Sequence, residues 1–174
     1  ILYRRDRFKL LDSGNFWLSK TPYEVSSVEG SLCNRICTWA LLTDKNTEKT
    51  FVIANTHLDH STDDIRKQQV YYLLSELSNL MRKYPVFLTG DFNTNPGSIV
   101  YADVVEKFRD PYISADENRS SIDYSLNNYG HNGTLIDYCF FDKRADALWY
   151  KIADEQFGGY VSDHYAVLAE VILK

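Results

Sequence analysis

Cysteine is scarce in this chain. Its 174 residues include three cysteines, Cys33, Cys37 and Cys139, and an odd number gives no framework of paired disulfides. Cys33 and Cys37 lack further cysteine or histidine partners at zinc-like spacing, so we predict no zinc site. Cys139 stands within an apolar run and is expected in the core.

Long apolar runs are also missing. No segment approaches the ~20 apolar residues that a membrane-spanning helix requires, and no signal peptide is recognisable. We therefore expect a soluble protein without a membrane span. We also expect it to be a monomer. The sequence leaves its compartment open between the cytoplasm and secretion.

Positive charge is not in excess. Lysine and arginine number 19 against 24 acidic residues, which gives a formal net charge of -5. A broad basic surface for nucleic acid is therefore not expected, although a local basic groove remains open. The chain has no glycine-rich phosphate loop and no regular alternation of strands with helices, which argues against a doubly wound nucleotide-binding fold.

Aromatic residues, in contrast, are plentiful at 14%, and hydrophobic residues make up 44% of the chain. These values are typical of a sheet-rich globular protein, and we expect residues 1–174 to lie within one domain. A turn is expected at 12–15. Periodicity and breakers predict helices at 61–84 and 98–108 and strands at 1–4, 8–11, 16–18, 35–43, 50–56, 86–88, 135–141, 147–154 and 165–173.

Short segments that combine a strand with polar side chains at one end occur four times along the chain. Each alone has an ordinary explanation, such as an aspartate that closes a turn or a histidine on the surface. Their combination and order indicate a catalytic site. The segments are Asn55-Thr56-His57-Leu58, Gly90-Asp91-Phe92-Asn93, Ile136-Asp137-Tyr138 and Ser162-Asp163-His164.

Hydrolysis of a phosphate ester would use side chains of these kinds. The reaction places negative charge on phosphate oxygens, so it needs cations or hydrogen-bond donors, and it needs a base that activates water. Asp91 and Asp163 can supply carboxylates to Mg²⁺, which prefers oxygen ligands. Asn93 can orient a phosphate oxygen or the attacking water, and Asp137 can hold His164 in one tautomer.

The ordered motifs resemble the endonuclease/exonuclease/phosphatase superfamily, which includes deoxyribonuclease I-like nucleases and several kinds of phosphatase. The resemblance covers essentially the whole chain, and residues 16–19 and 35–39 are most similar to small bacterial members. It implies a four-layer α/β sandwich, in which two mixed sheets lie face to face with helices outside. It also implies an active site at one end of the sandwich.

The resemblance implies a role for each polar residue on the substrate side of the site. His57 would contact the scissile phosphate and assist the leaving group, and Asp91 would orient or deprotonate the attacking water. Asn93 would hold the phosphate, and Arg35, close to the site, would contact it as well.

On the metal side, the resemblance implies that Asp163 and Asp91 ligate Mg²⁺ or Mn²⁺. His164, paired with Asp137, would stabilise the phosphate or serve as a base. Family members usually carry a further metal-binding glutamate upstream of the strand that Ile1 begins here, and residues 1–174 contain no equivalent. We therefore expect this chain to be the carboxy-terminal portion of such a domain, incomplete at its amino terminus.

The absence of this glutamate predicts weak metal binding by residues 1–174. Calorimetric titration with Mg²⁺ should give an affinity well below that of a complete family member, because one carboxylate ligand is missing. Binding as tight as that of a complete member would contradict the expectation.

The substrate remains open at this point. A phosphodiester or a phosphomonoester would fit the motifs, carried by a small metabolite, a lipid headgroup or a nucleic acid. One alternative is a catalytically impaired module that binds phosphate and retains the fold, because the glutamate is absent. Another is a carbohydrate-binding β-sandwich, which the tryptophan and tyrosine content favours but which has no need for histidines at strand ends.

Overall fold

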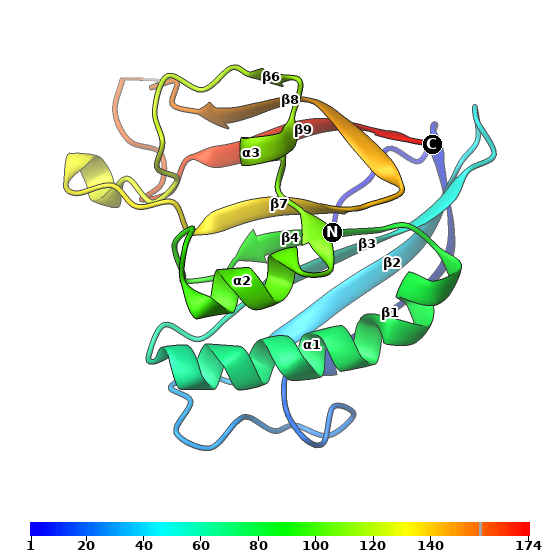
Figure 1. Ribbon diagram of the computed structural model, residues 1–174, viewed down its shortest axis with the longest axis horizontal. Helices are drawn as coiled ribbons and strands as arrows, with labels where there is room; N and C mark the ends of the chain where they lie inside the picture. Colours follow the sequence, from blue (N-terminus) through cyan, green and yellow to red (C-terminus); the bar gives the residue numbers. More distant parts are fainter. Residues whose placement is uncertain (157) are drawn as a thin grey trace.

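The computed structural model describes residues 1–156 and 158–174, and Figure 1 shows the course of the chain. Strands predominate, and helices interrupt them between β3 and β7. The elements are β1 (Phe8–Trp17), β2 (Ile36–Asp44), β3 (Thr50–His57), α1 (Asp63–Lys83), β4 (Val86–Asp91), α2 (Ile99–Val105), β5 (Phe108–Arg109), α3 (Pro111–Ser114), β6 (Glu117–Asn118), the 3₁₀ helix η1 (Asn128–Gly130), β7 (Asp137–Asp142), β8 (Ala145–Ala153) and β9 (Ala166–Leu173).

The strands form two mixed sheets. The larger sheet has the strand order β1-β2-β3-β4-β7-β5, in which β3 and β4 are parallel, and the smaller one has the order β6-β8-β9. The smaller sheet lies over one face of the larger sheet, while α1 and α2 lie on the opposite face (Figure 1). The structure confirms the predicted α/β sandwich of two mixed sheets with helices outside.

The long helix α1 follows from its sequence. The side chain of Thr62 accepts a hydrogen bond from the backbone N–H of Ile65, and acidic residues in the first turn and basic residues in the last suit the helix dipole. Its buried apolar residues include Val70, Leu73 and Leu77, which recur at helical spacing and join the core against the sheet. The prediction of this helix is confirmed, with ends that differ by one or two residues.

The prediction for the first residues was wrong in two respects. Residues 1–4 form no strand, and residues 12–15 form no turn but continue β1, which pairs with β2 from Phe8 to Trp17 around a bulge between Leu10 and Asp12. An edge strand exposes its polar side chains to water, so the polar run costs little there. Gly14 lies against Trp39, whose Nε1 would be 3.0 Å from an added Cβ, so this glycine makes room for the indole ring instead of marking a turn.

The second helix is shorter than predicted. It ends at Val105, and the buried Phe108 instead starts the two-residue strand β5, which pairs with β7. The last predicted turn of helix does not form, because the Phe108 ring is buried against the core. The short elements β5, α3, β6 and η1 carry too few residues for a periodic signal, so the sequence did not predict them.

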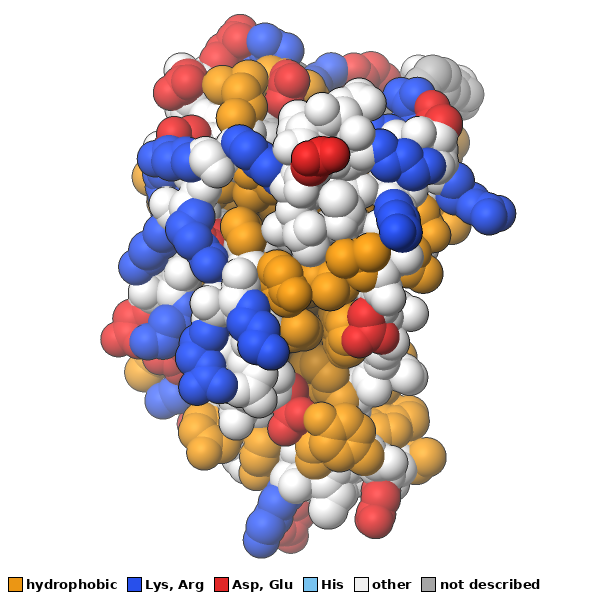
Figure 2. All heavy atoms as spheres, turned by 90° about the vertical axis from the view of Figure 1, so that its right-hand side faces the viewer, with side chains coloured by type: hydrophobic (Ala, Val, Ile, Leu, Met, Phe, Trp, Pro, Cys, Tyr) orange, Lys and Arg blue, Asp and Glu red, His pale blue; other side chains and the backbone are white. Residues whose placement is uncertain are grey.

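An open groove of about 900 Å³ separates the two sheets. Its lining includes Phe51, Ile53 and Phe87 from the larger sheet and Val171 from β9. Figure 2 looks at this end of the molecule, where hydrophobic side chains line the hollow. Lysine and arginine side chains gather most densely along its left flank, and several more lie at the upper right. β3 ends at His57 and β4 ends at Asp91, and Figure 2 views the opposite end of these strands, so the basic residues seen there do not form a groove at the polar motifs.

Within the described residues, no helix combines the length and apolar character that crossing a membrane requires.

Candidate active site

The larger sheet brings three of the predicted residues together at one end of its strands. The parallel strands β3 and β4 end together, which places His57 opposite Asp91. The antiparallel strand β7 begins at the same level, which places Asp137 opposite Asp91 on the other side. Side chains from three segments far apart in the sequence therefore meet at one end of the larger sheet.

His57 and Asp91 form the first pair. His57 Nε2 lies 3.3 Å from Asp91 Oδ2, with the histidine half exposed and the carboxylate largely buried. Burial lowers the pKa of His57, and the charge of Arg35 lowers it further, against the opposing effect of Asp91. Burial also raises the pKa of Asp91, with a further contribution from the charge of Asp137. The site thus favours a neutral His57 and an Asp91 that binds a proton more readily than an exposed aspartate does.

His164 and Asp137 form the second pair. His164 Nδ1 lies 2.7 Å from Asp137 Oδ2, so the ring presents Nδ1–H to the carboxylate and leaves Nε2 for a ligand. Burial alone would lower the pKa of His164, but the hydrogen bond and the charge of Asp137 outweigh it and raise the pKa. The two histidines of the site therefore differ in character, because their environments move their pKa values in opposite directions.

Asn93 has a left-handed backbone with φ of 48°, a conformation that asparagine tolerates better than most residues. This turn lets the backbone N–H of Asn93 donate to Asp91 Oδ1 at 2.8 Å. Its side-chain Nδ2 donates to the carbonyl of Leu58 at 3.0 Å. Asn93 thus ties the ends of β3 and β4 together and orients the Asp91 carboxylate.

Arg35 stands immediately before β2, close to the end of β3. Its Nη2 lies 3.4 Å from His60 Nδ1, and among the residues that the structure describes it forms an ion pair with no carboxylate. A cavity of about 220 Å³ is lined by Arg35 and His57 together, among other residues. The positive charge of Arg35 is therefore available to an anion beside His57.

Asp163 makes its hydrogen bonds outside the two histidine–aspartate pairs. Its backbone carbonyl accepts hydrogen bonds from the N–H groups of Asn127 and Asn128 at 2.7 and 3.0 Å, and its carboxylate accepts one from the Ser162 hydroxyl at 3.3 Å. In the described part of the chain, one group of acidic and histidine side chains has ligand atoms within 4.8 Å of one another, and it comprises Asp91, Asp137 and His164. Asp163 does not belong to that group.

Ser125 and Asn127 are buried polar residues that the sequence reasoning missed. The Ser125 hydroxyl accepts hydrogen bonds from the N–H groups of Ile136 and Asp137 at 3.1 and 3.0 Å, and the Ser125 carbonyl accepts one from Tyr165. Asn127 Nδ2 donates to the carbonyl of Ser162. These bonds join the start of β7 to the segment before β9, and no periodic pattern marks such residues in an irregular loop.

A second cavity, of about 360 Å³, lies beside these residues. His57, Asp91, Asp137 and Tyr165 contribute to its lining. Both residues of the first pair and Asp137 of the second therefore face one cavity. The sequence also offers the loop 154–161 for substrate contacts, and residue 157 of this loop lies outside the described residues.

The sequence of this chain matches a known protein family. A family model described as the endonuclease/exonuclease/phosphatase family matches residues 6–164, from the turn before β1 to His164 itself. The chain belongs to this family. The members of the endonuclease/exonuclease/phosphatase family act on phosphate esters, and the family generally uses divalent metals.

Solved structures of family members agree closely with this fold. A protein of the family from Bacteroides vulgatus superposes with a TM-score of 0.92 at 29% identity, over 99% of this chain and 69% of that chain. The mannosyl-6-phosphatase of Bacteroides thetaiotaomicron superposes with a TM-score of 0.91 at 27% identity, over 98% of this chain and 69% of that chain.

A curated relative is more distant. Nocturnin of Homo sapiens is 26% identical over 192 residues, which cover 98% of this chain and 42% of nocturnin. The chain spans less than half the length of the curated relatives that it matches.

Proposed function

We propose that this chain hydrolyses phosphate esters with the help of a divalent metal ion. The observation that carries the proposal is the convergence of His57, Asp91, Asp137 and His164 around one end of the sheet, in two contacting pairs at 3.3 and 2.7 Å. Residues 1–174 would lie within one domain of the endonuclease/exonuclease/phosphatase family.

Asp91 is the residue that we assign to the attacking water. Its raised pKa makes it a stronger base than an exposed aspartate, and Asn93 holds its other oxygen in place. His57, which the site keeps neutral, lies 3.3 Å from this carboxylate and would hydrogen-bond the scissile phosphate or the leaving group.

His164 is better suited to stabilising charge than to acting as a base. Its raised pKa favours the protonated ring, and the bond from Nδ1–H to Asp137 aims Nε2–H away from the carboxylate. A fixed cation that donates to a phosphate oxygen would stabilise the negative charge of the transition state. Arg35 would bind the phosphate from the side of β2.

A divalent metal fits the donors that are present. The ligand atoms of Asp91, Asp137 and His164 lie within 4.8 Å of one another, and Asp163, which the sequence predicts as a further ligand, directly precedes His164 in the chain. Carboxylates are donors that Mg²⁺ and Mn²⁺ accept, with water or substrate filling the remaining positions. When bound, the metal would supply Lewis-acid stabilisation of the phosphate oxygens.

For the substrate we favour a phosphomonoester of a small polar molecule. The similar structure from Bacteroides thetaiotaomicron is named a mannosyl-6-phosphatase. The formal net charge of -5 in this chain, and the position of its basic flank away from the catalytic motifs, give little support to a long nucleic acid.

The test is a hydrolysis screen across phosphomonoesters and phosphodiesters with Mg²⁺, with Mn²⁺ and with chelator. We expect metal-dependent turnover that the chelator abolishes. Replacing His164 by alanine should lower kcat by about a hundredfold or more. His131→Ala, in an exposed loop, is the matched control and should leave kcat unchanged.

The chain should be screened as it stands and within any longer polypeptide that contains it. Phosphate binding without turnover in both forms would favour the catalytically impaired binding module. Turnover that His164→Ala leaves unchanged would contradict the assignment of the site.

A further inference from the structure

The turn after β3 contains a buried carboxylate that the proposed chemistry does not use. Asp59 is 0% exposed. Its Oδ2 accepts hydrogen bonds from the backbone N–H groups of Leu32 and Cys33 at 3.0 and 2.9 Å, and its Oδ1 accepts one from Ser61 at 2.9 Å. One side chain therefore holds the turn after β3 and the loop that leads into β2.

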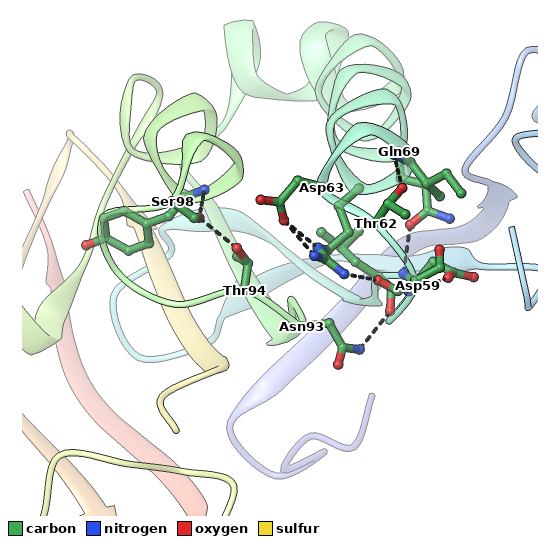
Figure 3. A network of polar contacts seen from close by, with 12 residues as sticks. Asp59, Thr62, Asp63, Gln69, Asn93, Thr94 and Ser98 are labelled. Atoms are coloured by element: carbon green, nitrogen blue, oxygen red, sulfur yellow. Dashed lines mark hydrogen bonds and ion pairs between the residues drawn. The ribbon is translucent and has the colours of Figure 1, made fainter. Parts of the chain in front are cut away.

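The backbone of Asp59 is fixed from the other side by α1. Gln69 Oε1 accepts the Asp59 N–H at 2.8 Å, and Arg66 Nη1 donates to the Asp59 carbonyl at 3.0 Å. Figure 3 shows these contacts together with the bond from Asn93 to the neighbouring carbonyl of Leu58. Asp59 is thus anchored to α1 and, through Leu58 and Asn93, to the end of β4.

Arg35 depends on this anchor more than on its own side-chain contacts. Its guanidinium has the 3.4 Å contact with His60 and, in the part of the chain that the structure describes, no ion pair with a carboxylate. Its place beside His57 is therefore set by its backbone. That backbone is held on one side by the Leu18 N–H, which donates to the Arg35 carbonyl at 2.8 Å, and by the pairing of β2 with its neighbouring strands. On the other side it is held by the bonds from Leu32 and Cys33 to Asp59.

The pKa of Asp59 is consistent with these hydrogen bonds. Burial opposes the ionisation of Asp59, but hydrogen bonds from Ser61 and Cys33 and the positive charge of Arg35 outweigh it and lower the pKa to about 2. Asp59 is consequently charged at neutral pH, and its charge lies close enough to Arg35 to interact with it.

We propose that Asp59 is a positioning residue, which holds Arg35 in the place where its guanidinium meets the substrate phosphate. The inference rests on the proposed function, because the ligand of Arg35 is there a phosphate group. Asp59 itself touches no substrate, so its effect should pass through Arg35 alone.

Inorganic phosphate is the probe, and its dissociation constant is measured by calorimetry on the whole chain. Arg35→Ala should weaken phosphate binding about tenfold, as expected for the loss of one charge-assisted contact. Asp59→Asn keeps the size of the side chain but turns one oxygen into a donor that faces backbone N–H groups, so it should weaken binding about fivefold. The double variant should bind within about twofold of Arg35→Ala, because both changes remove the same interaction.

A structural control separates positioning from general loss of stability. Asp142 is also a buried carboxylate that accepts backbone and arginine hydrogen bonds, but it lies at the end of β7 opposite Asp137. Asp142→Asn should lower the midpoint of urea unfolding as Asp59→Asn does, while leaving phosphate affinity within about twofold of the unmodified chain.

The outcomes separate the positioning role of Asp59 from the proposed function of the chain. Asp59→Asn with unchanged phosphate affinity, or single effects that multiply in the double variant, would overturn the positioning role and leave the proposed function intact. A chain that binds no phosphate before any substitution would contradict the proposed function, and the inference that rests on it would fall as well.

Discussion

Replacement of Asp91 by asparagine is expected to lower kcat for phosphate-ester hydrolysis by about a thousandfold, with KM nearly unchanged. Asparagine keeps the size of the side chain and can still accept the N–H of Asn93, which lies 2.8 Å from Asp91 Oδ1. It removes the base and the negative charge beside His57. The effect should therefore fall on the chemical step and not on the fold.

Steady-state kinetics with the best substrate of the hydrolysis screen would measure this effect. Asp12→Asn changes an exposed aspartate on the edge strand β1 and provides the matched control, for which kcat should not change. A loss of less than tenfold in Asp91→Asn would show that another group activates the water.

Replacement of Gly90 by alanine is expected to destabilise the fold by more than about 4 kcal/mol, enough to leave little folded protein. Gly90 has φ of 146°, and a Cβ added there would lie 1.8 Å from the backbone carbonyl oxygen of Thr56 on β3. The overlapping atom belongs to the backbone of a paired strand, so β3 and β4 would have to separate. This separation would occur one residue before His57 and Asp91.

Gly97→Ala is the control for the conformational part of this effect. Gly97 also has a positive φ, 90°, but a Cβ there would meet nothing within 4 Å. It should cost only about 1 kcal/mol, the strain of a side chain in a left-handed conformation. Urea unfolding followed by circular dichroism compares the two variants. Equal destabilisation by both would contradict the steric explanation for Gly90.

Local patterns predicted the long elements of the fold well. Helix α1 has a cap, charged ends and apolar residues at helical spacing, and β2, β3 and β9 are apolar, β-branched runs between breakers. The errors arose where tertiary contacts outweighed local preference. Pairing with β2 drew the polar residues Asp12 to Asn15 into an edge strand, and burial of Phe108 ended α2 early.

Motifs shared with one family also predicted several of the polar residues that the structure brings together, and they predicted the pairing of His164 with Asp137. They did not predict the contact of His57 with Asp91, and they placed Asp163 in a group of ligands to which it does not belong. The contacts between His57 and Asp91 and between His164 and Asp137 depend on strand register and on the loop that Ser125 and Asn127 hold, which local patterns do not encode.

Short motifs and hydrophobic periodicity are local properties of the chain, so they were enough to predict the family, the sandwich of two mixed sheets and the polar residues at the strand ends. The protonation behaviour of each residue, in contrast, arises only in the packed molecule. The same side chain, histidine, acquires a lowered pKa at position 57 and a raised one at position 164. Burial and neighbouring charge cause that difference, and both exist only once distant segments have packed together.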